Sequence, residues 1–153
     1  MVDVGQIDDA PLGYLLHRVG AALRPEVAAA LRPLNLSLAE FVCMRMLSLR
    51  PGLSSAELAR QGNVTPQAMN TVLRRLEELG AVSRPESVPS GRALPATLTR
   101  DGQALLKRAE AAVSTADGRI LAKLSSAEQR EFRRMLELLG SDQDSCDVLH
   151  PGV

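Results

Sequence analysis

The chain has 153 residues, a formal net charge of zero, 45% hydrophobic residues and only 2% aromatic ones. This length suits one small domain, and a core built from Leu, Val, Met and Ala favours helices over sheets. No run approaches the roughly 18 apolar residues of a transmembrane helix, and Asp8 and Asp9 stand where a signal peptide would be basic. We therefore expect a soluble, cytoplasmic protein with no membrane partner.

The chain opens with a short terminus and a long helical region. Residues 1–10 are polar, and we expect them to be flexible. In residues 11–34, apolar side chains recur in steps of three and four from Leu12 to Leu31, as they do on one face of a helix. Pro25 removes a backbone donor within this stretch, so we expect either a kink or two abutting helices.

Capping residues mark the starts of the next two helices. Ser37 and Ser54 are each followed three residues later by Glu, which is the capping-box pattern. The pattern predicts one helix that runs to Leu49 and a short one that runs to about Gln61. Residues 62–63, Gly and Asn, are typical of a tight turn.

A further helix is predicted directly after this turn. Thr65 caps it, and Pro66 occupies the first helical position, where the missing N–H costs nothing. The helix runs to Leu79 and ends at Gly80, a residue that suits the position after a helix C-cap. The short helix, the turn and this helix together form a helix-turn-helix.

A β-hairpin is predicted next. Two short strands, residues 81–84 and 93–99, flank a loop over residues 85–92 that is rich in Pro and Ser. Pro95 within the second strand suggests an edge position, because proline cannot donate to a neighbouring strand.

Two helices are predicted to close the chain. Thr99 caps a long one that runs to about Leu124, and Ser125 caps the last one, which runs to Leu139. The tail over residues 141–153 is polar and acidic, and we expect it to be flexible.

This order of elements predicts a mainly α protein. Residues 35–99 form a winged helix-turn-helix domain with a two-stranded β wing, a typical DNA-binding arrangement. Residues 11–34 and 100–140 add helices with apolar stripes that a core of about 65 residues cannot cover. A core shared between two subunits would cover them, so we expect these helices to hold a homodimer. The alternative is that the outer helices pack on one another within one chain.

The helix over residues 65–79 carries the proposed recognition face. At about 100° per residue, one side is apolar and the other is polar. The apolar side comprises Met69, Val72, Leu73, Leu76 and Leu79, and the polar side comprises Gln67, Asn70, Thr71, Arg74 and Glu78. Amide side chains pair with adenine edges and Arg pairs with guanine edges in the major groove of double-stranded DNA. The competing interpretation is a polar face that meets only water.

The remaining candidate contacts surround this helix. Arg92 follows a glycine at the tip of the hairpin, where an arginine suits the narrow minor groove. Arg74, Arg75 and Arg84 are candidates for phosphate contacts, although each could equally be a surface charge or an ion-pair partner. The predicted DNA-binding set is Ser54, Thr65, Pro66, Gln67, Asn70, Thr71, Arg74, Arg75 and Arg92.

Three stretches resemble the MarR family of bacterial transcriptional regulators. They are residues 58–80 (LARQGNVTPQAMNTVLRRLEELG), residues 91–92 (Gly-Arg) with residues 98–102 (LTRDG), and residues 37–41 (SLAEF), in the family's order and spacing. The resemblance covers about residues 10–140. It implies an obligate dimer whose two recognition helices enter successive major grooves of a pseudo-palindromic operator.

The resemblance also implies individual contacts. It places Thr65, Gln67, Asn70, Thr71 and Arg74 on DNA, with Arg92 in the minor groove, and it suggests a repressor. The chain departs from the family pattern in its wing, which has one arginine, one glutamate and two prolines, and at Pro25 in the first helix.

MarR-like proteins commonly respond to small anionic aromatic molecules or to oxidants. The resemblance suggests an effector pocket between the dimer helices and the DNA-binding lobe, which Tyr14, His17 and Arg18 could line. The alternative is that these three residues form a surface or an interface without a ligand. Cys43 is expected to be a buried, inert thiol, and Cys146 is given no role.

No enzymatic motif, cofactor or metal site is predicted. The two cysteines are far apart, His17 and His150 are isolated, and the GxSxG, P-loop and GxGxxG patterns do not occur in the sequence. The other function that fits the fold is a winged-helix module that binds a protein and never touches DNA. An apolar patch on the recognition face would favour that function.

Overall fold

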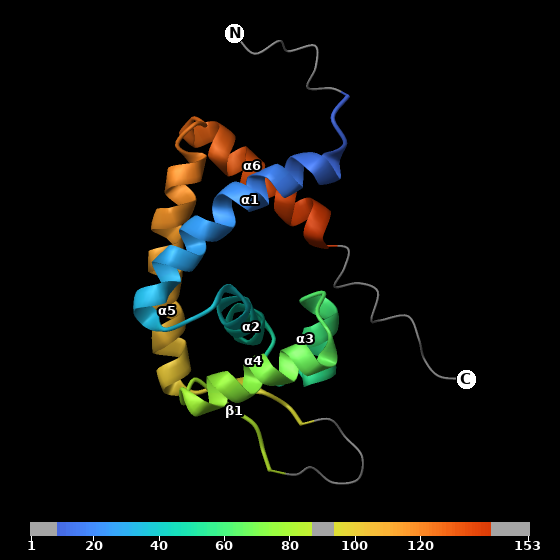
Figure 1. Cartoon of the computed structure of the whole chain (residues 1–153), viewed down its shortest axis with the longest axis vertical. Coiled ribbons are helices and arrows are strands. Elements are labelled where there is room, and N and C mark those ends of the chain that lie inside the picture. The colour runs from blue at the N-terminus through green and yellow to red at the C-terminus, as the bar shows by residue number, and fades with distance from the viewer. Residues whose placement is uncertain (1–8, 87–93, 142–153) are drawn as a thin grey trace, which may run out of the picture. The chain divides into compact units, whose positions relative to one another are not determined.

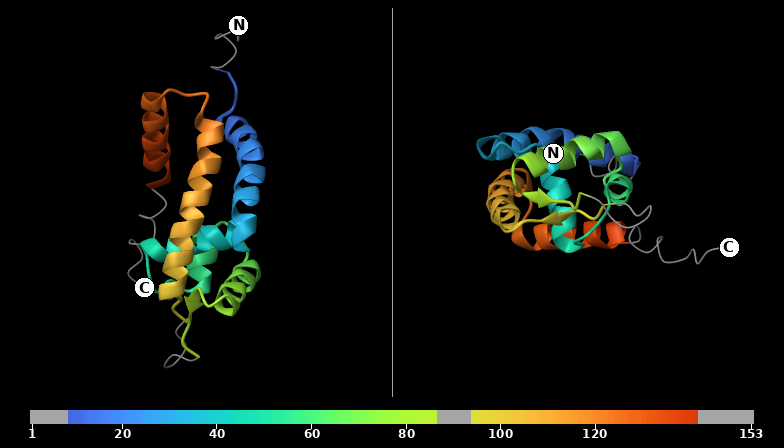
Figure 2. Two further views of the ribbon diagram at one scale, coloured as in Figure 1. Left: turned by 90° about the vertical axis from the view of Figure 1, so that its left-hand side faces the viewer. Right: turned by 90° about the horizontal axis from the view of Figure 1, so that it is seen from below.

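The computed structural model describes residues 9–86 and 94–141 (Figures 1 and 2). The chain forms two compact units, divided after Ile120. The first unit contains most of the predicted elements, and the second contains the last helix. Most of the described chain is helical, with one small antiparallel sheet. The predicted winged-helix fold is confirmed.

Helix α1, Leu12–Leu31, runs without interruption through Pro25. The alternative of two abutting helices is therefore wrong. Val27 and Leu31, both beyond the proline, are almost fully buried, and this packing stabilises the helical turns that follow Pro25. A short 3-10 helix, η2 at Arg32–Leu34, follows and was not predicted; Asn35 ends it with a φ of 56°.

The next three helices follow the predicted starts. They are α2 at Leu38–Leu49, α3 at Ser55–Gln61 and α4 at Pro66–Glu78. The capping boxes of α2 and α3 form as expected: each serine hydroxyl accepts from the glutamate N–H, and each glutamate accepts from the serine N–H.

The two strands of the wing are shorter than predicted, and a third segment of the chain pairs with the residue before the second of them. Strands β1 (Val82–Ser83) and β2 (Thr97–Leu98) pair antiparallel, while Leu53, before α3, forms a bridge with Ala96. Pro95 precedes the paired residues, so it lies outside the strand, in contrast to the prediction. The base of the wing is thus tied to the segment that leads into the helix-turn-helix.

The core of the first unit lies between α2, α3, α4 and the start of the wing. It is aliphatic, as the composition predicts, and the side chains of Leu31, Met44, Leu47, Leu58, Leu73 and Leu76 are fully buried in it. Helix α5, Arg100–Leu121, adds Leu106, Ala109, Val113 and Ala116 to the same core.

The second unit holds α6, Ser126–Gly140, which Ser125 and Glu128 cap as predicted. Helix α5 ends at Leu121 and not near Leu124, because the chain turns there and the Gln129 amide donates to the carbonyls of both residues at 3.0 Å. No residue of α6 is buried.

The described residues contain no single helix that is long and apolar enough to cross a bilayer. Only the stretches Leu12–Leu34 and Leu38–Leu49 taken together are both long and apolar enough, and they are bent by 81°.

Candidate nucleic-acid interface

The N-terminus of α4 is fixed by its own capping residues and by a tight turn. The Thr65 hydroxyl accepts from the Ala68 N–H at 3.1 Å, and Pro66 occupies the first turn. Before it, Asn63 adopts a left-handed φ of 51°, and the Gly62 N–H closes α3 on the Leu58 carbonyl at 2.8 Å. This turn fixes the direction of α4 relative to α3.

Helix α4 divides into the two predicted faces. Met69, Leu73 and Leu76 are buried, whereas Gln67, Thr71 and Arg74 are exposed and Asn70 and Arg75 are half-buried. The polar face is therefore presented to solvent along the first three turns of the helix, which is the geometry that major-groove binding requires.

Three side chains on this face form no hydrogen bond within the described parts of the chain. The side chains of Gln67, Asn70 and Arg74 form no hydrogen bond or ion pair with any other residue in the described parts of the chain. Thr71, in contrast, donates its hydroxyl to the Gln67 carbonyl at 3.1 Å, and Arg75 lies 4.0 Å from Glu78. Free amide and guanidinium donors on an exposed helix are the groups that read base edges.

Ser54, in contrast to the residues of this face, is buried. It is only 8% exposed, and its hydroxyl caps α3 by accepting from the Glu57 N–H at 3.2 Å. The reciprocal bond from the Ser54 N–H lowers the pKa of the Glu57 carboxyl. The structure gives Ser54 a capping role, and its contact with DNA stays a prediction.

At the other end of α4, an ion pair joins the helix to the residue that follows β1. The Arg84 guanidinium donates to both carboxylate oxygens of Glu77, at 3.1 and 2.8 Å, and only 17% of the Arg84 side chain is exposed. Of the interpretations left open for Arg84, the ion-pair partner is the one observed. Arg92, the predicted minor-groove residue, lies outside the described residues.

The three predicted effector residues lie on α1. Tyr14, His17 and Arg18 are all exposed, and the Arg18 guanidinium carbon is 5.9 Å from the centre of the Tyr14 ring, a cation–π contact. They lie on one face of α1, and they line neither of the two cavities described below.

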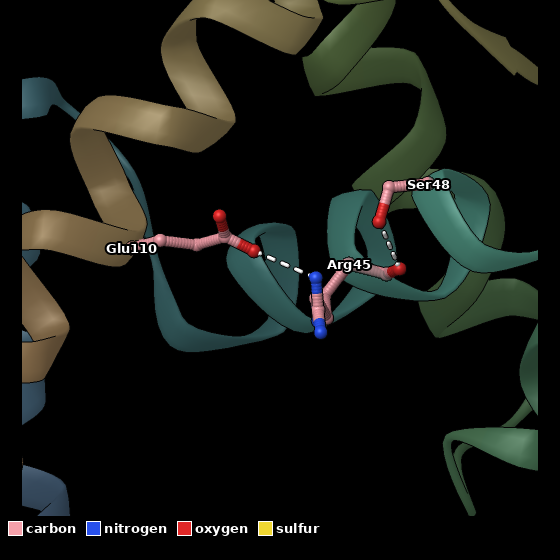
Figure 3. A network of polar contacts seen from close by, with 3 residues as sticks. All are labelled: Arg45, Ser48 and Glu110. Atoms are coloured by element: carbon pink, nitrogen blue, oxygen red, sulfur yellow. Dashed lines mark hydrogen bonds and ion pairs between the residues drawn. The ribbon is translucent and has the colours of Figure 1, made fainter.

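A cavity of about 330 Å³ lies beneath the wing, between α2, β2 and the start of α5. Leu47, Leu98 and Leu106 form its apolar part, and Arg45, Ser48, Gln103, Lys107 and Glu110 supply polar groups. Arg45 and Glu110 form an ion pair of 2.9 Å across it, and the Ser48 hydroxyl donates to the Arg45 carbonyl (Figure 3). A second hollow, of similar size but more open, includes Arg32 and Arg75.

No sequence pattern indicated this cavity, because its two ion-pair partners are 65 residues apart and neither belongs to a recognisable motif. Cys43, in contrast, is fully buried as predicted, and burial raises the pKa of its thiol to about 12. The protonated thiol is a poor nucleophile.

Comparisons with known proteins decide the family. Residues 36–94 match the model of the MarR family. The chain is 72% identical over 139 residues to the HTH-type transcriptional repressor Rv2887 of Mycobacterium tuberculosis, covering 91% of this chain and all of that protein. The chain belongs to the MarR family.

Solved structures of MarR proteins agree with the fold. Mycobacterium tuberculosis Rv2887 in complex with salicylic acid matches with a TM-score of 0.74 at 73% identity, over 86% of this chain and 98% of that one. The same protein in complex with DNA gives 0.75 at 68% identity, over 86% and 99%. Escherichia coli MarR, at 23% identity and a TM-score of 0.74, has the same fold.

Proposed function

We propose that this MarR-family chain is a homodimeric repressor that binds double-stranded DNA at a pseudo-palindromic operator through α4. The observation that carries the proposal is the exposed face of α4, on which the side chains of Gln67, Asn70 and Arg74 have no hydrogen-bonding partner in the described chain. The complex of its relative Rv2887 with DNA supports the same function. Such a regulator acts where the bacterial chromosome lies, in the cytoplasm, and involves no catalytic step.

Thr65, Pro66 and Thr71 are exposed beside these residues and approach the duplex with them. Because the hydroxyls of Thr65 and Thr71 already bond to α4 itself, they contribute position and shape more than base recognition. Arg75 and the wing residue Arg92 are assigned to the DNA backbone and to the minor groove, respectively.

The dimer is supported by the apolar side chains that the single chain leaves exposed. On α1 they include Leu12, Leu16 and Val19, and on α6 Met135, Leu136, Leu138 and Leu139, all between 41% and 69% exposed. Two helices with such faces are unusual on a monomer surface and typical of an interface between copies. We assign α1 and α6 to this interface on these exposed side chains. We assign α5 to it on the family resemblance, because Leu106, Ala109, Val113 and Ala116 of α5 are buried in the core of its own chain.

We further propose that a small aromatic carboxylate releases the repressor from DNA. Crystal complexes of Rv2887 with salicylic acid and with p-aminosalicylic acid support this class of effector. The cavity beneath the wing suits it, because Leu47, Leu98 and Leu106 can cover a ring while Lys107 and Arg45 attract a carboxylate. The ligand would compete with Glu110 for Arg45. Tyr14, His17 and Arg18 remain the alternative site.

The experiment that tests DNA binding is selection of bound fragments from the source genome by the purified full chain, followed by titration of the best fragment at several salt concentrations. We expect affinity to fall steeply with salt, because each phosphate contact releases counterions. Specific fragments should share two inverted half-sites. If the chain binds no fragment even at low salt, the protein-interaction module becomes the better explanation of the fold.

A further inference from the structure

The C-terminus of α4 ends in a tightly bonded turn. The Gly80 N–H donates to the Glu77 carbonyl and the Ala81 N–H donates to the Leu76 carbonyl, both at 2.9 Å, and Gly80 has a φ of 73°. This is a Schellman motif, which needs a residue free to adopt a left-handed backbone. It fixes the direction in which the chain leaves the recognition helix, and Ala81 is 1% exposed.

Thr99, just before α5, is bonded to the same turn. Its N–H donates to the Ala81 carbonyl at 3.0 Å, and its hydroxyl donates to the Gly80 carbonyl at 2.5 Å. The same hydroxyl oxygen accepts from the Gly102 N–H at 3.0 Å, so it also caps α5. One hydroxyl therefore connects the end of α4 to the first turn of α5.

Gly102 brings the two backbones into direct contact. A Cβ atom built on Gly102 would lie only 1.9 Å from the Ala81 carbonyl oxygen, where at least about 3.0 Å is needed. The clash is between a Cβ whose position the Gly102 backbone fixes and the backbone of Ala81, so a rotamer change cannot relieve it. Even alanine would force α5 away from the turn that ends α4 by about 1 Å.

Helix formation alone does not account for this pair of residues. An N-cap needs only the threonine, and glycine within a helix is less favourable than alanine. The glycine is required because Ala81 lies against it, and Ala81 is held there by the turn after the recognition helix.

We propose that Thr99 and Gly102 are positioning residues, which fix the recognition helix relative to α5 and thereby set the separation of the two recognition helices in the dimer. The proposal rests on the proposed function, in which α5 contributes to the dimer interface and α4 enters DNA. Two half-sites on one duplex are bound together only if that separation matches their spacing.

The test compares two duplexes, one with both operator half-sites and one in which a half-site is replaced by unrelated sequence. Gly102→Ala is the main variant. Gly118→Ala is its control, because Gly118 lies on the same helix and an added Cβ there meets no atom of the described residues of its own chain within 4 Å. Thr99→Val removes the hydroxyl at nearly constant shape, and Thr99→Ser keeps it. Circular dichroism and sedimentation velocity check that each variant is a folded dimer.

We expect Gly102→Ala to lose about tenfold or more in affinity for the two-site duplex but less than about threefold for the one-site duplex, since only the former needs both helices in register. Its optimal half-site spacing should also shift. Gly118→Ala and Thr99→Ser should stay close to the unmodified protein, and Thr99→Val should follow Gly102→Ala.

Equal losses on both duplexes, or no loss in a folded Gly102→Ala dimer, would overturn the positioning role. If Gly102→Ala does not fold, Thr99→Val decides by the same comparison. Failure of the unmodified protein to bind either duplex is a different outcome, because it overturns the proposed function itself.

Discussion

The Arg84 guanidinium donates two hydrogen bonds to the Glu77 carboxylate, at 3.1 and 2.8 Å, and so joins the last turn of α4 to the residue that follows strand β1. The bond from Arg84 is the largest cause that lowers the pKa of the Glu77 carboxyl below its ordinary 4.5. The pair is partly buried, which protects it from solvent screening better than a surface pair.

Replacing Glu77 with Gln should lower the free energy of unfolding by about 1 kcal/mol at pH 7, because a bidentate, charge-assisted contact is lost. A carboxyl whose folded pKa is depressed contributes stability that is present above its unfolded pKa and disappears as the pH falls through its folded pKa. The difference between the two proteins should therefore shrink below pH 4.5. Urea denaturation from pH 7 to pH 3 measures it.

Glu78→Gln is the matched control for this pair. Glu78 is the next residue on α4, but it is 62% exposed and lies 4.0 Å from Arg75. An exposed pair of this kind contributes little, so the control should change the unfolding free energy by less than about 0.5 kcal/mol. Equal changes in the unfolding free energy for the two substitutions would show that the Arg84–Glu77 contact stabilises the protein no more than the exposed Arg75–Glu78 pair does.

Replacing Arg74 or Gln67 with Ala should weaken binding to the selected operator by about 1–3 kcal/mol and binding to random DNA by much less, because base-edge contacts are lost. Arg130→Ala, which removes an exposed positive charge on α6, controls for net charge. Fluorescence anisotropy with both DNA classes separates the effects. An operator affinity that survives the Arg74 and Gln67 substitutions would reject the assigned face.

The apolar face of α6 gives a prediction about assembly. Leu136 is 41% exposed in the single chain, so Leu136→Glu should leave the protomer folded but place an unpaired carboxylate in the proposed interface. Two-fold symmetry repeats the change in the partner, and we expect monomers in sedimentation velocity with operator affinity reduced by about 100-fold. Arg130→Glu on the same helix is the control. A Leu136→Glu dimer as stable as the unmodified one would exclude this face.

The effector site can be located with two arginines. Arg45→Gln should weaken salicylate binding about 10–100-fold in calorimetry, as expected for the loss of a charged hydrogen-bond partner. Arg18→Gln should have no such effect, and neither should Arg108→Gln, which removes a charge on α5 outside the cavity. The reverse pattern would assign the effector to Tyr14, His17 and Arg18.

The sequence predicted the features that depend on neighbouring residues. The starts of α2, α3 and α6 follow from serine and glutamate three residues apart, and the two faces of α4 follow from apolar spacing. These signals act within one or two turns of helix, so no knowledge of the tertiary structure is needed to interpret them.

Features that depend on distant residues were not predicted. The Arg45–Glu110 pair, the cavity it crosses and the Leu53–Ala96 bridge join segments that only tertiary packing brings together. The continuation of α1 through Pro25 has the same origin, because burial of Val27 and Leu31 outweighs the lost backbone bond. The leucine–threonine–glycine motif at residues 98–102 was recognised, but its contact with Ala81 was not.

The Leu53–Ala96 bridge has a consequence for how such a regulator can diversify. The Ala96 N–H donates to the Leu53 carbonyl and the Gly52 N–H donates to the Ala96 carbonyl, both at 2.9 Å, so the returning arm of the hairpin is anchored independently of its outward arm. Insertions, deletions or exchanges of residues between Glu86 and Leu94 need not disturb either anchor. In related chains this interval can therefore vary in length and sequence while the helical framework is inherited unchanged.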